Sequence, residues 1–154
     1  MVQYAASTDV SSEKSLTEIK RTVTRYGATH FGFLDEPGRA SVAFRLGDRQ
    51  VRFALPLPDR QAREFAHHSR GVREKQAADR LYEQAIRQRW RALALAVKAK
   101  LEAVESGIGE FDAEFYAYLV LPNGRTMFEE TRDQVIHAIE AGATGRLMLE
   151  APGA

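Results

Sequence analysis

One apolar stripe constrains the fold of this chain more than any other feature. Between residues 76 and 106, large apolar side chains recur at intervals of three and four positions. This spacing places them on one side of an α-helix of about six turns or more. Gly107 follows, and glycine is a frequent helix stop. We therefore predict a long amphipathic helix whose stripe consists of Tyr82, Ile86, Trp90, Leu93, Val97, Leu101 and Val104.

A second helical stripe lies near the N-terminus, after an irregular lead-in over residues 1–10. Ser11 or Ser12 can cap this helix, and Glu13 in its first turn favours the positive helix end. Gly27 ends the pattern. We predict a helix over residues 12–26 with an apolar stripe of Leu16, Ile19, Val23 and Tyr26.

The apolar period changes from helical to two between these helices, which is typical of β-strands. Proline and glycine at positions 37 and 38 predict a turn, and Gly47-Asp48 predicts a two-residue hairpin loop. The chain is thus expected to form a three-stranded antiparallel meander. Its alternating apolar residues are Phe31 and Phe33, then Val42, Phe44 and Leu46, then Val51, Phe53 and Leu55.

The hairpin loop also predicts the register of the last two strands. It places Phe44 opposite Val51, Val42 opposite Phe53, and Leu46 opposite Arg49. These apolar residues, with Phe31 and Phe33, share the core face. The other face, with Arg45 opposite Gln50, Ala43 opposite Arg52, and His30 nearby, is expected to meet solvent.

The rest of the chain has weaker patterns. Pro56 and Pro58 end the sheet, and residues 60–75 are predicted to form a mobile loop or a short helix. Residues 111–119 favour a short helix, although a strand over residues 116–121 with a hairpin at Asn123-Gly124 also fits. Thr126 and Glu129 form a capping box. It opens a helix that ends at Gly142, with Val135, Ile136 and Ile139 predicted to point inward; the tail after Arg146 is expected to be loose.

Together these elements predict one α+β domain over residues 1–154: an N-terminal helix, a three-stranded antiparallel meander, a long amphipathic helix and a helical C-terminal region. The sequence contains no cysteine, which excludes disulfides, thiolate zinc sites and cysteine nucleophiles. The first residues do not resemble a signal peptide, and the longest apolar run, residues 92–97, is too short to cross a bilayer. We expect a cytoplasmic protein without a membrane partner.

Charge is distributed in blocks that the formal net charge of +1 conceals. Residues 60–100 contain eleven Lys/Arg and four Asp/Glu, whereas residues 101–154 contain three and ten. A basic block points to nucleic acid or another polyanion. The acidic block offers a rival explanation, because the two blocks can neutralise each other within one chain or between two copies.

On the long helix, Arg80, Arg87, Arg91 and Lys98 lie at intervals of seven, four and seven. At about 100° per residue these cations fall within about 40° of one another, on a line about 110° from the apolar stripe. Such a row can follow phosphates. We predict phosphate contacts from these four residues, assisted by a flexible arm carrying Arg70, Arg73 and Lys75. A second candidate surface is the solvent face of the sheet, with Arg45 and Arg52.

Patterns typical of catalysis are absent. His67 and His68 are adjacent, so they point in different directions and do not suggest a metal site. The glycines at 107 and 109 do not form a phosphate loop, and the carboxylates match no nuclease spacing. We expect no cofactor and no metal, and favour a non-enzymatic protein.

Five segments carry a resemblance: residues 25–28 (RYGA), 55–60 (LPLPDR), 87–93 (RQRWRAL), 98–105 (KAKLEAVE) and 121–126 (LPNGRT). Together they resemble a group of small uncharacterised proteins of bacteriophages and prophages, over roughly residues 4 to 140. The resemblance implies a setting in the host cytoplasm, in replication, recombination or counter-defence, and no catalytic residues. The order of elements is also similar to double-stranded-RNA-binding and strand-annealing folds, but the basic region at the second helix of those RNA-binding domains is not reproduced.

These observations lead to two functional hypotheses. The first is a phage-type accessory protein that binds nucleic acid through its phosphates, without strong sequence preference. The second is a protein-interaction or assembly module, such as an adaptor or counter-defence inhibitor, whose basic helix pairs with an acidic surface; its partner is then another protein or a second copy of the chain.

Overall fold

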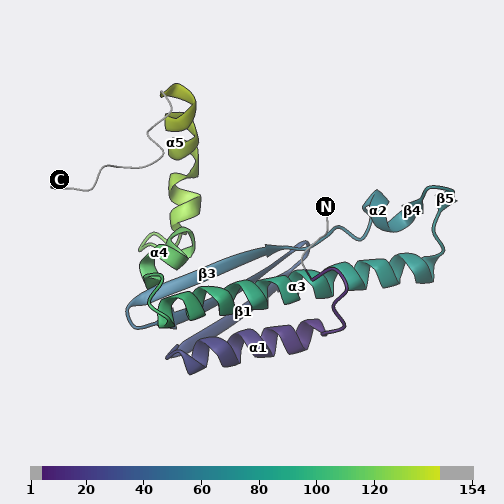
Figure 1. Cartoon of the computed structure of the whole chain (residues 1–154). Coiled ribbons are helices and arrows are strands. Elements are labelled where there is room, and N and C mark those ends of the chain that lie inside the picture. The colour runs from purple at the N-terminus through teal and green to yellow at the C-terminus, as the bar shows by residue number, and fades with distance from the viewer. Residues whose placement is uncertain (1–4, 143–154) are drawn as a thin grey trace.

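The computed structural model describes residues 5–142 and has the predicted α+β fold (Figure 1). Helix α1 (Ser12–Arg25) is followed by a three-stranded antiparallel sheet, in which β2 (Arg39–Leu46) lies between β1 (His30–Glu36) and β3 (Arg49–Pro56). The long helix α3 (Lys75–Glu105) and helix α5 (Met127–Ala141) come later in the chain. The boundaries of α1 and α3 lie within one residue of those predicted from the apolar stripes.

Local chemistry explains where α1 begins and ends. The Ser11 hydroxyl accepts a hydrogen bond from the backbone N–H of Lys14 at 3.2 Å, which satisfies one of the free donors of the first turn. At the other end Gly27 has a φ of 103°, a left-handed conformation that favours glycine and turns the chain towards β1.

The sheet has the register that the Gly47-Asp48 loop predicts. Phe44 lies opposite Val51, Val42 opposite Phe53, and Leu46 opposite Arg49. The side chains of Val42, Phe44, Val51 and Phe53 are all buried. Because strand side chains alternate between faces, the apolar set lies on one side and Arg45 with Arg52 on the other.

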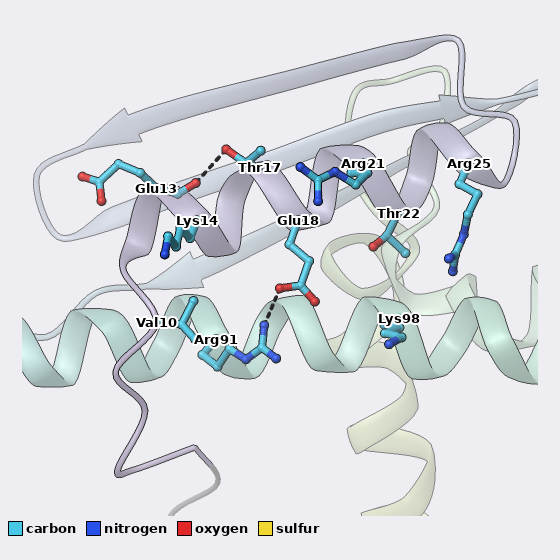
Figure 2. Close-up of a pocket in the computed structure, with 10 residues that line it drawn as sticks. All are labelled: Val10, Glu13, Lys14, Thr17, Glu18, Arg21, Thr22, Arg25, Arg91 and Lys98. Carbon is cyan, nitrogen blue, oxygen red and sulfur yellow. Dashed lines mark hydrogen bonds and ion pairs between the residues drawn. The ribbon is translucent and has the colours of Figure 1, made fainter.

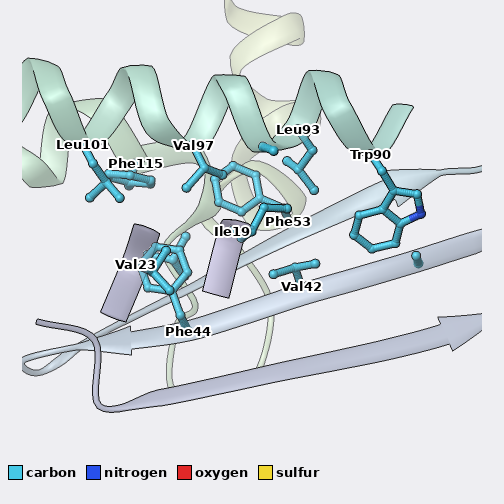
Figure 3. Close-up of a cluster of buried hydrophobic side chains, with 13 residues drawn as sticks. Ile19, Val23, Val42, Phe44, Phe53, Trp90, Leu93, Val97, Leu101 and Phe115 are labelled. Atoms are coloured by element: carbon cyan, nitrogen blue, oxygen red, sulfur yellow. The ribbon is translucent and has the colours of Figure 1, made fainter. Parts of the chain in front are cut away.

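Helices α1 and α3 lie side by side over the apolar face of the sheet (Figures 1 and 3). Their apolar stripes turn towards that face, and the core contains Ile19 and Val23 from α1 with Trp90, Val97 and Leu101 from α3. Both helices run in the same direction, since Glu18 meets Arg91 and the later residue Tyr26 lies by Glu105.

One aromatic residue departs from the predicted core. Phe33 lies on the apolar face but remains 45% exposed. It belongs to β1, the edge strand, and its ring makes an edge contact with Trp90 at 5.6 Å between centroids. The periodicity identified its face correctly, but not that the helices leave this edge of the sheet partly open.

Residues 60–75 form short regular elements rather than a loop alone. Helix α2 (Arg63–Ala66) is followed by a two-stranded hairpin of β4 (His67–His68) and β5 (Gly71–Val72). The ring of Phe65, which is buried, contacts Tyr82 of α3 at 5.6 Å. This contact attaches the segment to the first turns of α3.

Both interpretations of residues 111–121 are partly correct. Helix α4 (Phe111–Phe115) leads into the short 3-10 helix η1 (Tyr116–Tyr118). Leu119 then forms an isolated bridge with Val51 at the β3 edge, and the Val120 N–H donates to the Gln50 carbonyl at 2.8 Å. The aromatic residues therefore form helix, while the next two residues extend the edge of the sheet.

Helix α5 begins at the predicted capping box and ends at Gly142. The prediction that Val135, Ile136 and Ile139 point inward is wrong: they are 51%, 39% and 72% exposed. The helix leaves the body of the protein after η1, its main contact, and projects away from α1 and α3 (Figure 1). Its pattern correctly predicted an amphipathic helix, but the chain folds nothing over its apolar side within residues 5–142. The tail after Arg146 lies outside the described residues.

Among residues 5–142 there is no helix that combines the length and the apolar character needed to span a membrane.

The central role of Phe115 yields a stability prediction. Its side chain is fully buried and its ring contacts Phe44, Phe53 and Phe111. We expect Phe115→Ala to lower the free energy of unfolding by about 3–5 kcal/mol, because it opens a cavity where α4 meets the sheet. Urea unfolding measures this change. The matched control Ile108→Ala removes a side chain that is 85% exposed and should cost less than about 0.5 kcal/mol; equal losses would contradict this account of the core.

Candidate nucleic-acid interface

A groove of about 690 Å³ runs between α1 and α3 (Figure 2). Helix α1 contributes one wall and α3 the other, while the lead-in to α1 reaches one end of the groove. Ten residues line it: Val10, Glu13, Lys14, Thr17, Glu18, Arg21, Thr22, Arg25, Arg91 and Lys98.

The groove carries five cations and two carboxylates. Three of the cations, Lys14, Arg21 and Arg25, come from α1 and were not among the predicted site residues. Their intervals of seven and four match part of the row on α3, so a signal was present in the sequence. The near-neutral charge of the first 59 residues as a block conceals this row.

Arg91 is already engaged within the groove. Its guanidinium group bonds to the Glu18 carboxylate across the two helices, and the side chains are 23% and 34% exposed. The positive excess therefore rests on Lys14, Arg21, Arg25 and Lys98, all of them exposed residues. Within residues 5–142, the side chains of Lys14 and Arg21 form no hydrogen bond or ion pair, while Lys98 approaches Glu102 only to 4.0 Å.

The predicted row on α3 is divided between two environments. Arg91 and Lys98 line the groove, whereas the Arg87 guanidinium bonds to the Gln84 side chain. Gln84 in turn donates to the carbonyl oxygens of Ala6 and Thr8, so the lead-in lies across α3 beside Arg87. Arg80 is exposed on the earlier part of the helix, about 27 Å from Lys98 at 1.5 Å per residue.

The predicted assisting arm is folded into the β4–β5 hairpin. The Arg73 guanidinium donates to the His67 carbonyl at 2.9 Å, while Arg70 and Lys75 are exposed. These three residues lie at the N-terminal end of α3. They are therefore separated from the groove by much of the length of α3.

On the second candidate surface, the solvent face of the sheet, Arg52 contacts a carboxylate and Arg45 does not. On the open face of the sheet, Arg45 is exposed and bonds only to the nearby Gly47 carbonyl. The Arg52 guanidinium donates to the Gly124 carbonyl at 2.9 Å and to Glu129 at 3.2 Å. Arg52 therefore anchors the turn before α5.

Two arginines of β3 pair with carboxylates of the acidic final third, residues 101–154. Arg49 forms two hydrogen bonds of 2.9 Å with Asp112, and Arg52 pairs with Glu129. Within residues 5–142, the ion pairs and hydrogen bonds from side chains of the basic block to this third are the 4.0 Å approach of Lys98 to Glu102 and a 2.8 Å bond from Lys100 to the Glu114 carbonyl. No guanidinium of the basic block is paired with these carboxylates in the described part.

These contacts lower the pKa values of two carboxyl groups. The hydrogen bond from Arg49 holds the pKa of Asp112 below its usual value, and the same bond raises the pKa of Arg49. The backbone N–H of Thr126 lowers the pKa of Glu129, with a further contribution from Arg52.

The described residues contain no group of three or more His, Asp or Glu side chains placed to hold a metal ion. Comparisons of the chain with family models, with curated proteins and with solved structures found no match. Function must therefore be argued from the site itself.

The lowered pKa values predict how stability depends on pH. Asp112 and Glu129 stabilise the fold where they are ionised, above about pH 4, and this contribution is lost as the pH falls through their lowered pKa values. We expect the melting temperature to fall on acidification, and to fall less in Asp112→Asn than in the wild type. Asp133→Asn, at a side chain 96% exposed, is the control and should follow the wild type. Identical acid profiles for Asp112→Asn and the wild type would contradict the role of the Arg49–Asp112 pair.

Proposed function

We propose that this chain is a non-enzymatic accessory protein of phage type that binds the phosphate backbone of nucleic acid in the α1–α3 groove. The observation that carries the proposal is the excess of cations there, five against two carboxylates, from two helices that face one another (Figure 2). A groove with this charge attracts a polyanion, and the counterions released on binding supply the driving force.

The lining of the groove supports backbone contacts rather than base recognition. None of its ten lining residues is aromatic, and Trp90 and Phe44 are buried in the core instead. Base stacking needs exposed aromatic rings, so the groove offers no stacking platform. Binding with little sequence preference and strong salt dependence follows.

The exposed cations outside the groove extend the same surface. Arg80 lies further along α3, and Arg70 and Lys75 lie at its N-terminal end, whereas Arg87 and Arg73 are held by internal hydrogen bonds. We assign the groove the principal contacts and these three residues a supporting role. The resemblance to phage proteins supports a setting in the host-cell cytoplasm.

Fluorescence anisotropy with labelled 20-nucleotide single strands and duplexes of DNA and RNA tests the proposal. The variant combining Arg21→Gln with Lys98→Gln removes one groove cation from each helix. We expect weaker binding to every sequence and a slope of log affinity against log salt reduced by about 2, because each phosphate contact contributes about one unit. The matched control combines Arg39→Gln with Arg45→Gln, which removes two exposed arginines of β2 on the open face of the sheet.

The comparison of the two double variants decides between the surfaces. Loss of affinity in the groove variant with an unchanged control supports the groove. Equal losses, or loss in the control alone, would move the interface to the sheet. Absence of salt-dependent binding to all four nucleic acids would refute the proposed function.

The Glu18–Arg91 pair leads to a prediction of tighter, rather than weaker, binding. Glu18→Gln removes one carboxylate from the groove and releases Arg91 for an external anion. We expect binding at low salt to become about two- to tenfold tighter, since charge-assisted contacts to phosphate are among the stronger hydrogen bonds. The effect should shrink as salt increases. Weaker binding by this variant, with an unchanged melting temperature, would contradict the proposed position of the phosphates.

A further inference from the structure

Helix α5 has an apolar side, interrupted by Arg132, that nothing covers in the described chain. At 100° per residue, Val135, Phe128, Ile139 and Ile136 fall within one arc of about 100°. These side chains are 51%, 55%, 72% and 39% exposed, and no residue of the helix is buried. An isolated helix of 15 residues is marginal in water, so a partner surface over this side would stabilise α5.

The charges of α5 argue against two kinds of partner. Its polar side carries Glu129, Glu130, Asp133 and Glu140, so it repels nucleic acid and the headgroups of anionic lipids. Helices that lie on membranes usually carry Lys and Arg on that side. The body of the protein is also excluded over residues 5–142, since α5 contacts η1 and points away from the sheet (Figure 1).

A second copy of α5 fits this surface. Arg132 lies within the apolar arc, where its guanidinium sits 6.0 Å from the centroid of the Phe128 ring. Glu140 lies about 80° further round, just beyond the Ile136 edge of the arc. When two α5 helices pair antiparallel about a point between Val135 and Ile136, equivalent edges face each other, and Arg132 of each copy comes level with Glu140 of the other, within about 1.5 Å along the axis.

We propose that α5 is a self-association helix, which joins two copies of this chain as an antiparallel pair through Phe128, Val135, Ile136 and Ile139. Arg132 reaches from within this contact to Glu140 at the rim of the other copy. The pairing is isologous and closes on itself, as two-fold interfaces do. It is independent of nucleic-acid binding. A two-helix contact is smaller than the roughly 800 Å² per partner of a standard interface, so the dimer depends on concentration.

Sedimentation equilibrium of the full chain over about 5–500 µM measures the association, a range suited to an interface below standard size. We expect a monomer–dimer equilibrium that Ile139→Glu weakens at least about tenfold, because a carboxylate enters the apolar contact. The matched control is Ile108→Glu, at an apolar side chain 85% exposed outside α5, which should leave the equilibrium unchanged. Arg132→Glu and Glu140→Arg should each weaken the dimer, and their combination should restore it.

The lack of cysteine in this chain allows a direct test of helix direction. In the antiparallel pair, Val135 lies within about 1.5 Å of its counterpart along the axis, whereas Phe128 lies about 22 Å from its own. Val135→Cys should therefore form a disulfide dimer under mild oxidation, and Phe128→Cys should not. A parallel pair would cross-link at both positions.

Three outcomes would overturn the proposal. They are a wild-type chain that stays monomeric throughout the concentration range, a dimer unaffected by Ile139→Glu, and a dimer that cross-links equally at both cysteine positions. Co-flotation of a monomeric wild type with phosphatidylcholine vesicles, abolished by Ile139→Glu, would assign the apolar side to a lipid surface instead and also overturn it.

Discussion

The packing of α1 beside α3 on one face of the sheet determines where the other surface features lie. Each helix turns its apolar stripe towards Val42 and Phe44, so the polar sides of both helices face away from the sheet and meet along a single groove. Cations that are far apart in the sequence, such as Arg21 and Lys98, come together for this reason. The groove is thus a consequence of how the core is formed, with no loop needed to build it.

Some arginines of this chain pair with carboxylates and hold parts of the fold together, whereas other cations have no such partner in the described residues. The side chains of Arg49 and Arg52 extend from β3 and pair with Asp112 and Glu129, which attaches the C-terminal region to β3. Exposed ion pairs of this kind contribute little free energy each, so their value lies in fixing position. The cations of the groove have one cross-helix carboxylate partner, Glu18, and the remaining excess is open to an external anion.

How far the sequence predicts this structure depends on the range of the interactions involved. The register of β2 against β3 was predictable to the residue, because the Gly47-Asp48 loop and the period-two pattern act locally and agree with each other. The capping box at Thr126 was predictable for the same reason. The groove was not, since it depends on which side of α1 faces α3. The exposure of Ile139 was not predictable either, because an apolar stripe predicts that a helix face will be covered but does not identify what covers it.

The two proposed surfaces act on one molecule in ways that reinforce each other. Under the two proposals, a dimer joined through α5 would carry two groove surfaces on one particle, so the second groove would meet a bound strand at a raised effective concentration. Because the proposed α5 contact is mainly apolar, salt would weaken phosphate binding by each groove far more than it would weaken the dimer. The proposed α5 contact would therefore set how many grooves act together, and the charge of each groove would set its affinity for phosphates.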